Sequence, residues 1–203
     1  MIWAASEGHT DVVKILLNKG ANPLIEDDHG KTALVHALLK NHLQSAQLLY
    51  KGGADLNINL LYAAKRGFPE MVSYLLKQGA DHSWITEKQE TPLILASLAK
   101  NHKCAEILLK QGADPDWTDQ NSLSALNHAV MNGDLEMVKL LWNVNANLNQ
   151  EDLQQISPFY TACLNGNFQV VHFLSKINIQ KVVNPCRGCL LYTSDAADDS
   201  LRV

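Results

Sequence analysis

A short motif, Gly-Ala followed by Asp or Asn, recurs along the chain at a nearly constant spacing. Its copies begin at Gly20, Gly53, Gly79 and Gly112, with Asn145 replacing the glycine in the last copy. The steps in sequence number are 33 (20 to 53), 26 (53 to 79), 33 (79 to 112) and 33 (112 to 145). A fixed period of this length is typical of arrays in which one small structural unit is stacked many times. The period therefore constrains the fold more strongly than the length of 203 residues, which alone indicates one or two globular domains.

Each copy of the motif follows a short amphipathic pattern in which pairs of apolar residues lie four positions apart. The first copy shows it at Val12, Val13, Leu16 and Leu17. This spacing predicts a helix with one apolar stripe. The glycine that follows is the expected end of the helix, because glycine adopts a left-handed conformation without a Cβ penalty, and asparagine is the best substitute.

A second, shorter helix is predicted before each of these. Thr91-Pro92 and Ser157-Pro158 are typical of an N-cap hydroxyl followed by proline at the first helical position. Small residues follow at a fixed register that allows neighbouring helices to approach closely: Ala4, Ala5, Ala37, Ala63, Ala64, Ala96, Ser97, Ala129 and Ala162. Glycine then ends this helix in most copies, whereas Asn41 and Lys100 replace it in two, and Lys100 is the less favourable substitute.

The order of turn, helix, tight loop, helix and projecting hairpin resembles the ankyrin repeat over about residues 1–188. The resemblance implies an all-α ankyrin-repeat solenoid: stacked helix-turn-helix units with projecting β-hairpin fingers. We expect about six units, including partial ends, over residues 1–24, 25–57, 58–83, 84–116, 117–149 and 150–188.

Two departures from the family pattern lead to structural expectations. The histidine of the family's TPLH tetrapeptide, which ties down the turn in the family, is absent; its place is taken by Val35, Leu61, Ile94, Asn127 and Tyr160. We therefore expect packing to hold these turns. The interval of 26 leaves the third unit seven residues short between Asp55 and Leu60, which predicts a truncated finger and a notch in the row of fingers.

Both ends of the array are expected to be incomplete. Met1 aligns with Leu34, inside a first helix, and another unit is due after Gly188. Residues 189–203 resemble a translated transposon-end adapter of sequencing libraries, so we interpret them as a non-native tail. The Cys186-x-x-Cys189 spacing is therefore not predicted to be a redox or zinc element, because its second cysteine belongs to that tail.

Composition argues against several classes of function. The formal net charge of -4 provides no basic field for nucleic acid, and no apolar run is long enough for membrane insertion. Four cysteines do not form a disulfide framework in this length. We expect an intracellular, cytoplasmic protein and a monomeric array.

No constellation of residues predicts catalysis, a metal or a cofactor. His36 and His128 share one register on the first helix, but the intervening copies offer no ligand, and a zinc site needs three or four. Cys104 and Cys163 fall at positions of small core residues. The chain is therefore predicted not to be an enzyme.

Two tryptophans form a repeating feature, since Trp84 and Trp117 lie one full period apart at the start of successive fingers. Tryptophan is enriched among binding hot spots, so both are candidates for partner contact. The alternative is that they pack one finger against the next.

Acidic residues at the fingertips are a second feature, namely Glu26, Asp27, Asp28 and Asp119. A solvated loop is the ordinary interpretation, and a field that selects a basic partner segment is the sharper one. The Glu151-Asp152 pair lies at the tip of a further finger.

The resemblance also implies that residues just after the small-residue step take part in recognition. The candidates are Leu39, Lys40, Lys65, Arg66, Leu98, Met131 and Asn132. Leu39, Leu98, Met131 and Leu164 share one register, which predicts an apolar stripe on the concave face; a register shifted by one residue would bury that stripe instead.

These features predict a protein–protein interaction module that acts as a scaffold or adaptor through its concave face and fingertips. The alternative is a targeting or regulatory arm of a larger enzyme or channel. The identity of the partner protein is not encoded in any motif.

Overall fold

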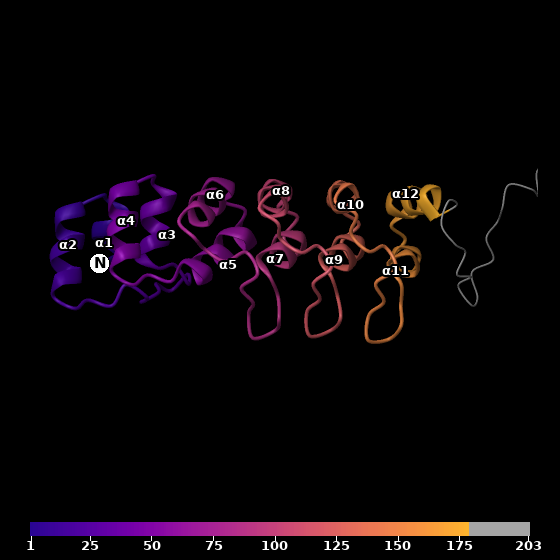
Figure 1. The fold of residues 1–203 in the computed structure, drawn as a ribbon, viewed down its shortest axis with the longest axis horizontal. Helices are drawn as coiled ribbons and strands as arrows, with labels where there is room; N and C mark the ends of the chain where they lie inside the picture. The colour runs from indigo at the N-terminus through magenta and orange to yellow at the C-terminus, as the bar shows by residue number, and fades with distance from the viewer. Residues whose placement is uncertain (179–203) are drawn as a thin grey trace, which may run out of the picture.

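The computed structural model describes residues 1–178, and within them it forms twelve α-helices arranged as six consecutive pairs (Figure 1). We call these pairs units 1 to 6. They are α1 (Ile2–Ser6) with α2 (Thr10–Asn18), α3 (Ala33–Leu39) with α4 (Leu43–Lys51), α5 (Leu56–Arg66) with α6 (Pro69–Lys77), α7 (Pro92–Leu98) with α8 (His102–Lys110), α9 (Ala125–Met131) with α10 (Leu135–Asn143), and α11 (Pro158–Leu164) with α12 (Phe168–Asn178).

The first helix of units 2, 4, 5 and 6 begins at a hydroxyl residue, as the sequence predicts. The side chains of Thr32, Thr91, Ser124 and Ser157 each accept a hydrogen bond from the backbone N–H three residues later. Such a cap satisfies one of the backbone donors that a helix start leaves without a partner. The start of each of these helices is thus fixed locally.

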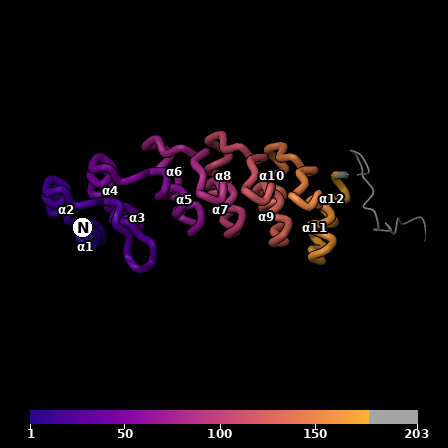
Figure 2. Tube along the Cα trace, turned by 90° about the horizontal axis from the view of Figure 1, so that it is seen from below, coloured from indigo at the N-terminus to yellow at the C-terminus, as the bar shows by residue number. Residues whose placement is uncertain are grey.

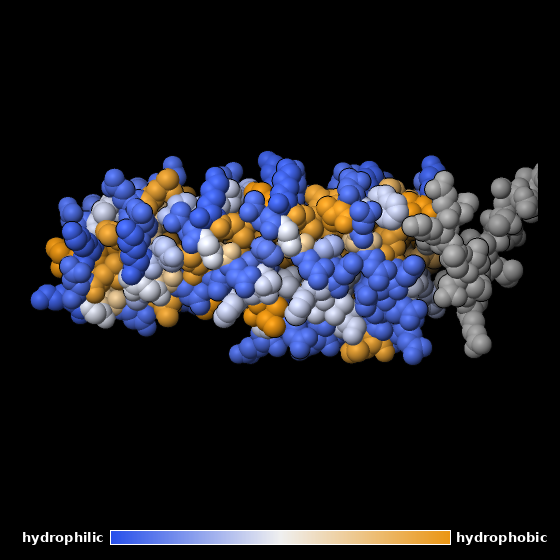
Figure 3. All heavy atoms as spheres, viewed as in Figure 1, coloured by the Kyte–Doolittle hydropathy of each residue, from blue (hydrophilic) through white to orange (hydrophobic). Residues whose placement is uncertain are grey.

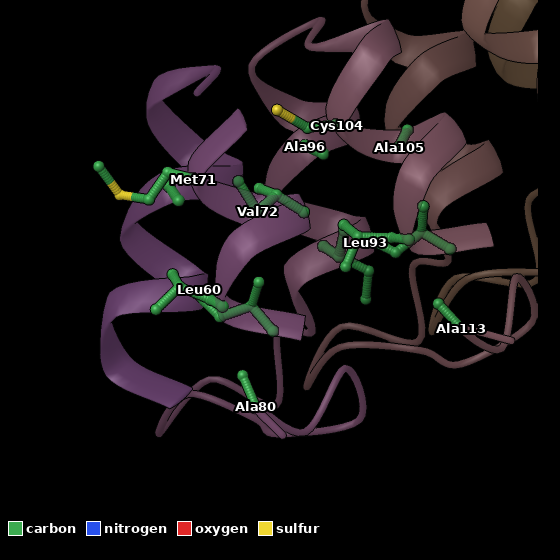
Figure 4. Packing of buried hydrophobic residues seen from close by; sticks show 14 of the residues in the cluster. Leu60, Met71, Val72, Ala80, Leu93, Ala96, Cys104, Ala105 and Ala113 are labelled. Atoms are coloured by element: carbon green, nitrogen blue, oxygen red, sulfur yellow. The ribbon is translucent and has the colours of Figure 1, made fainter. Parts of the chain in front are cut away.

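The core lies between the two layers of helices and continues from unit to unit. All the small residues of the first helices except Ala4, which is half-buried, are buried as predicted, with Ala96 and Ala129 fully inaccessible. Val72 and Leu93 lie in the layer between units 3 and 4 (Figure 4). Burying a leucine side chain contributes roughly 1.5–3 kcal/mol, so these layers are the main source of stability.

The loop inside each pair adopts the left-handed conformation that the glycines predict. Gly133 has φ of +64°, and the Asn167 side chain of the next unit lies over it, donating to the carbonyl of Val130 at 2.7 Å. Lys100 takes the same conformation, with φ of +57°. A lysine is strained there because its Cβ crowds the following carbonyl.

We expect Lys100→Gly to stabilise the chain by about 0.5 kcal/mol, because relief of roughly 1 kcal/mol of strain is partly offset by the entropy of the unfolded glycine. The substitution also removes the hydrogen bond from Lys100 Nζ to the carbonyl of Asn132, but this bond is exposed and water replaces it at little cost. Equilibrium urea unfolding measures the change. Lys103→Gly, an exposed position inside α8, is the control and should destabilise by about 1 kcal/mol. A loss of stability in Lys100→Gly would contradict the strain argument.

Projecting loops precede the first helices of units 2, 4, 5 and 6, and those of units 4, 5 and 6 project from one side of the stack (Figure 1). We call them fingers 2, 4, 5 and 6; they span residues 19–32, 78–91, 111–124 and 144–157. Isolated antiparallel bridges join Glu26 to Thr32 and Thr118 to Ser124. The tip of each finger is closed by one side-chain oxygen that accepts from the backbone N–H groups two and four residues later; these tip residues are Asp27, Thr86, Asp119 and Asp152.

Unit 3 has no finger, which confirms the predicted truncation. α4 ends at Lys51 and α5 begins at Leu56, where Asp55 caps the new helix by accepting from Asn57 N at 2.7 Å. The Asn57 side chain then accepts from the backbone of Asp81 in finger 4 at 2.8 Å. An extra helical turn therefore contacts the base of finger 4, and a gap remains where the tip of a third finger would stand (Figure 1).

The stacking is uneven along the array. Within units 1–2 and within units 3–6 the first helices pack side by side, whereas α3 and α5, and likewise α4 and α6, make few contacts. Figures 1 and 2 show that α1–α4 run in a different direction from the later helices. A buried hydrogen bond from Thr32 Oγ1 to Asn59 Oδ1, 2.8 Å long, links units 2 and 3. Equal packing of every unit on its neighbours, the ordinary expectation for a repeat array, is thus not observed.

Cys186, Cys189 and the segment 189–203 lie outside the described residues. The interpretation of that segment as a non-native tail stays a prediction.

Candidate protein-binding surface

Three apolar side chains are exposed in register at the ends of adjacent first helices. Leu98 on α7, Met131 on α9 and Leu164 on α11 are 39%, 45% and 62% exposed, and α9 packs between α7 and α11. We call these three residues the apolar row. Its exposure confirms the predicted register. Leu39 is also exposed, but Lys65 of unit 3 separates it from the row.

The backbone of the apolar row is held by the following unit. Asn132 Nδ2 donates to the carbonyl of Leu98 at 3.2 Å, and Asn165 Nδ2 donates to that of Met131 at 3.3 Å. Both amides occupy the position directly after the row residue of their own unit. Asn132, a candidate for partner contact, is thus half-buried and used inside the array, and its bond fixes the place of Leu98.

The basic candidates Lys40, Lys65 and Arg66 are all exposed. Lys40 Nζ lies 3.2 Å from Glu7 Oε1 of unit 1, and its hydrogen bond lowers the pKa of that carboxyl. The Arg66 guanidinium lies 5.6 Å from the ring centroid of Tyr62, a cation–π distance. Lys40 borders the junction between units 2 and 3, whereas Lys65 and Arg66 lie at the end of α5, which packs directly against α7 of the apolar row.

The two finger tryptophans differ in their surroundings. Trp117 Nε1 donates to the carbonyl of Gln89 in finger 4 at 3.0 Å, so this indole joins one finger to the next. Trp84 is 44% exposed, and its indole N–H has no hydrogen-bond acceptor among residues 1–178. Trp117 therefore packs one finger against the next, as in the alternative interpretation, whereas partner contact by Trp84 stays a prediction.

The acidic tips also fall into two groups. Glu26 and Asp28 are exposed as expected. The expectation that Asp119 is a solvated tip charge is wrong, because its side chain is turned inward and is only 7% exposed. Its Oδ2 lies 3.0 Å from Nε2 of His128 on α9.

Asp27 makes the same contact, with its Oδ2 2.8 Å from His36 Nε2. This hydrogen bond, followed by that from the backbone of Lys31, lowers the Asp27 pKa to about 2. In units 2 and 5 a carboxylate–imidazole pair thus connects the finger to the first helix. The expectation that packing alone holds these turns is wrong for those two units.

A further pair, which the sequence reasoning missed, links the second-helix side of units 4 and 5. His102 Nε2 lies 2.8 Å from both carboxylate oxygens of Asp134. Asp134 also caps α10 by accepting from Met137 N. The role of Asp134 as a helix cap could have been predicted from the sequence, because aspartate is common at the N-cap position.

The chemistry available within residues 1–178 is limited. No group of three His, Cys, Asp or Glu residues in that range could hold a metal ion. The Cys104 thiol is buried, and burial raises its pKa to about 11, which suppresses the reactive thiolate. No helix in the same range has the length and apolarity needed to cross a bilayer. Apolar side chains reach the surface as patches among hydrophilic ones (Figure 3).

Comparison with known proteins identifies the family. A family model described as ankyrin repeats (3 copies) matches residues 1–59, 60–119 and 108–184. Among curated relatives, potassium channel AKT2/3 of Arabidopsis thaliana is 38% identical over 42% of this chain and 12% of its own length. The B-cell lymphoma 3 protein homolog of Mus musculus is 32% identical over 46% and 22%, and the E3 ubiquitin-protein ligase KEG of Arabidopsis thaliana is 34% identical over 35% and 5%. The matched region thus covers less than a quarter of each relative, and the chain itself belongs to the ankyrin repeat family.

Proposed function

We propose that this chain is a non-catalytic protein-binding module that acts as a scaffold or adaptor through the apolar row and the neighbouring fingers. The observation that carries the proposal is the exposure of Leu98, Met131 and Leu164 in register on adjacent helices. Exposed apolar groups on a preorganised surface favour association, because their burial removes apolar area from water while little conformational entropy is lost.

A peptide library of random sequence, displayed on phage and selected against the immobilised chain, tests this proposal without a known partner. We expect selected peptides to lose at least about tenfold in affinity when Leu98→Glu and Met131→Glu are combined, as is typical for central interface residues. Ile15→Glu is the control, since Ile15 is an apolar side chain on α2 that is also exposed, to 59%. Peptide binding that persists in the combined Leu98→Glu and Met131→Glu variant but is lost in the Ile15→Glu variant would show that the binding site lies away from the apolar row.

A second candidate function is that of a targeting or regulatory arm in a larger protein. It is favoured by the relatives, since a potassium channel and an E3 ubiquitin-protein ligase contain the matched region as a small part of their length. Determining the transcript on both sides of this sequence tests it. A catalytic or channel domain in the same reading frame would support the arm, and further ankyrin units alone would support the scaffold.

A further inference from the structure

Finger 5 binds finger 4 through two hydrogen-bond donors on one edge. Trp117 Nε1 donates to the carbonyl of Gln89 at 3.0 Å, and the backbone N–H of Gln120 donates to that of Lys88 at 3.0 Å. The acceptors are two consecutive carbonyls at the tip of finger 4. The contact therefore recognises a turn of backbone rather than particular side chains.

Finger 4 repeats the same two donors one period earlier in the sequence, at Trp84 and Glu87. Its tip has the same internal geometry, because Thr86 N donates to Glu90 O at 3.1 Å as Asp119 N donates to Leu123 O at 3.0 Å. The matched turns place the Glu87 N–H where the Gln120 N–H lies in finger 5, and Trp84 occupies the sequence position of Trp117. We call the Trp84 indole and the Glu87 N–H the donor edge.

The donor edge has nothing to bind inside the array, because unit 3 has no finger. Neither the Trp84 indole N–H nor the Glu87 backbone N–H reaches an acceptor within residues 1–178. Both residues are exposed, Trp84 to 44%. The two donor groups that are hydrogen-bonded in finger 5 are thus exposed to solvent in finger 4.

We infer that the donor edge binds a turn of a partner protein that presents two consecutive backbone carbonyls, as Lys88 and Gln89 do toward finger 5, and that takes the place of the missing finger. The finger 4–finger 5 contact is the template for this occupant. Main-chain hydrogen bonds supply affinity in such additions to an open edge, and the exposed indole face adds apolar contact area. The inference extends the proposed function to a surface separate from the apolar row.

The probe is a peptide that copies residues 84–91 and is closed by a disulfide between added terminal cysteines. The chain is labelled with 5-fluorotryptophan, and its four indole signals are assigned by single Trp→Phe variants and followed by fluorine NMR. We expect the Trp84 signal to shift saturably as peptide is added, while those of Trp3 and Trp117 stay in place. An unmoved Trp84 signal, or an equal shift with the same peptide left open by replacing its two cysteines with serine, would overturn the inference.

Variants separate the donor edge from nonspecific binding, with the fluorescence anisotropy of labelled peptide as the readout. Trp84→Phe removes the donor but keeps an aromatic ring, and it should weaken binding by about fivefold, the scale of one hydrogen bond. Trp3→Phe is the control, since Trp3 is exposed on α1 in unit 1. Equal affinity in Trp84→Phe and the parent chain would refute the role of the indole.

A second variant fills the gap by inserting a copy of residues 111–124 in place of residues 52–58, which restores the 33-residue period. Because the added finger would supply its own carbonyls to the donor edge, peptide binding should be lost. Retained binding would show that the peptide sits elsewhere. The combined Leu98→Glu and Met131→Glu variant should bind the peptide normally, so failure of this inference and failure of the proposed function are distinguishable.

Discussion

Replacing Asp119 by alanine is expected to destabilise the chain by about 3 kcal/mol, the upper part of the range for leaving buried polar groups without partners. The carboxylate is buried and accepts from three donors: the backbone N–H groups of Asn121 and Leu123 and the ring of His128. Removing this one acceptor group deprives all three donors at once, which places the expected cost high in that range. Urea unfolding followed by circular dichroism measures the loss.

The corresponding substitution in finger 6 is a matched control. Asp152 accepts from the backbone of Gln154 and Ile156 in the same way, but Thr161 replaces the histidine on α11. We expect Asp152→Ala to cost about 1 kcal/mol, on the scale of lost exposed backbone bonds. If the two substitutions cost the same, the carboxylate–imidazole pair contributes nothing to stability.

Gly133→Ala is expected to destabilise the chain by about 2 kcal/mol, because it adds backbone strain and removes a hydrogen bond. The residue has φ of +64°, and an added Cβ would lie 2.8 Å from Asn167 Oδ1, too close for an unshifted contact. The left-handed conformation costs an alanine about 1 kcal/mol. Displacing Asn167 from the Val130 carbonyl removes a hydrogen bond of similar worth.

Gly166 separates these two contributions. It has nearly the same φ, +65°, but no atom lies within 4 Å of an added Cβ. Gly166→Ala should therefore cost only the conformational part, about 1 kcal/mol. Thermal unfolding of both variants measures the difference. Equal losses of stability would show that the Asn167 side chain moves aside at no cost in free energy.

The sequence was sufficient to predict the features that depend on local conformation and on period. The left-handed positions, the hydroxyl caps, the missing finger of unit 3 and the exposure of Leu98 and Met131 all follow from residue type and register. They could be predicted because each unit repeats the same local rules, so that one copy informs the others.

The features that the sequence reasoning missed depend on side-chain direction within a turn. Asp119 is turned inward because a histidine lies nine residues later, and Asp27 with His36 has the same spacing. That repeated spacing was a usable signal. The Trp117–Gln89 bond had no such signal, because its acceptor is a backbone carbonyl whose position depends on how two fingers align.

The sparse contact between units 2 and 3 bears on how the array comes apart. In a repeat protein, cooperativity spreads only through the interfaces between neighbours, and a weak interface divides the chain into separate cooperative blocks. Units 1–2 form a block smaller than the three repeats usually needed for independent stability, whereas units 3–6 exceed that number. Denaturation should therefore proceed in two steps, with the N-terminal block melting first while the apolar row and the donor edge stay folded on the second.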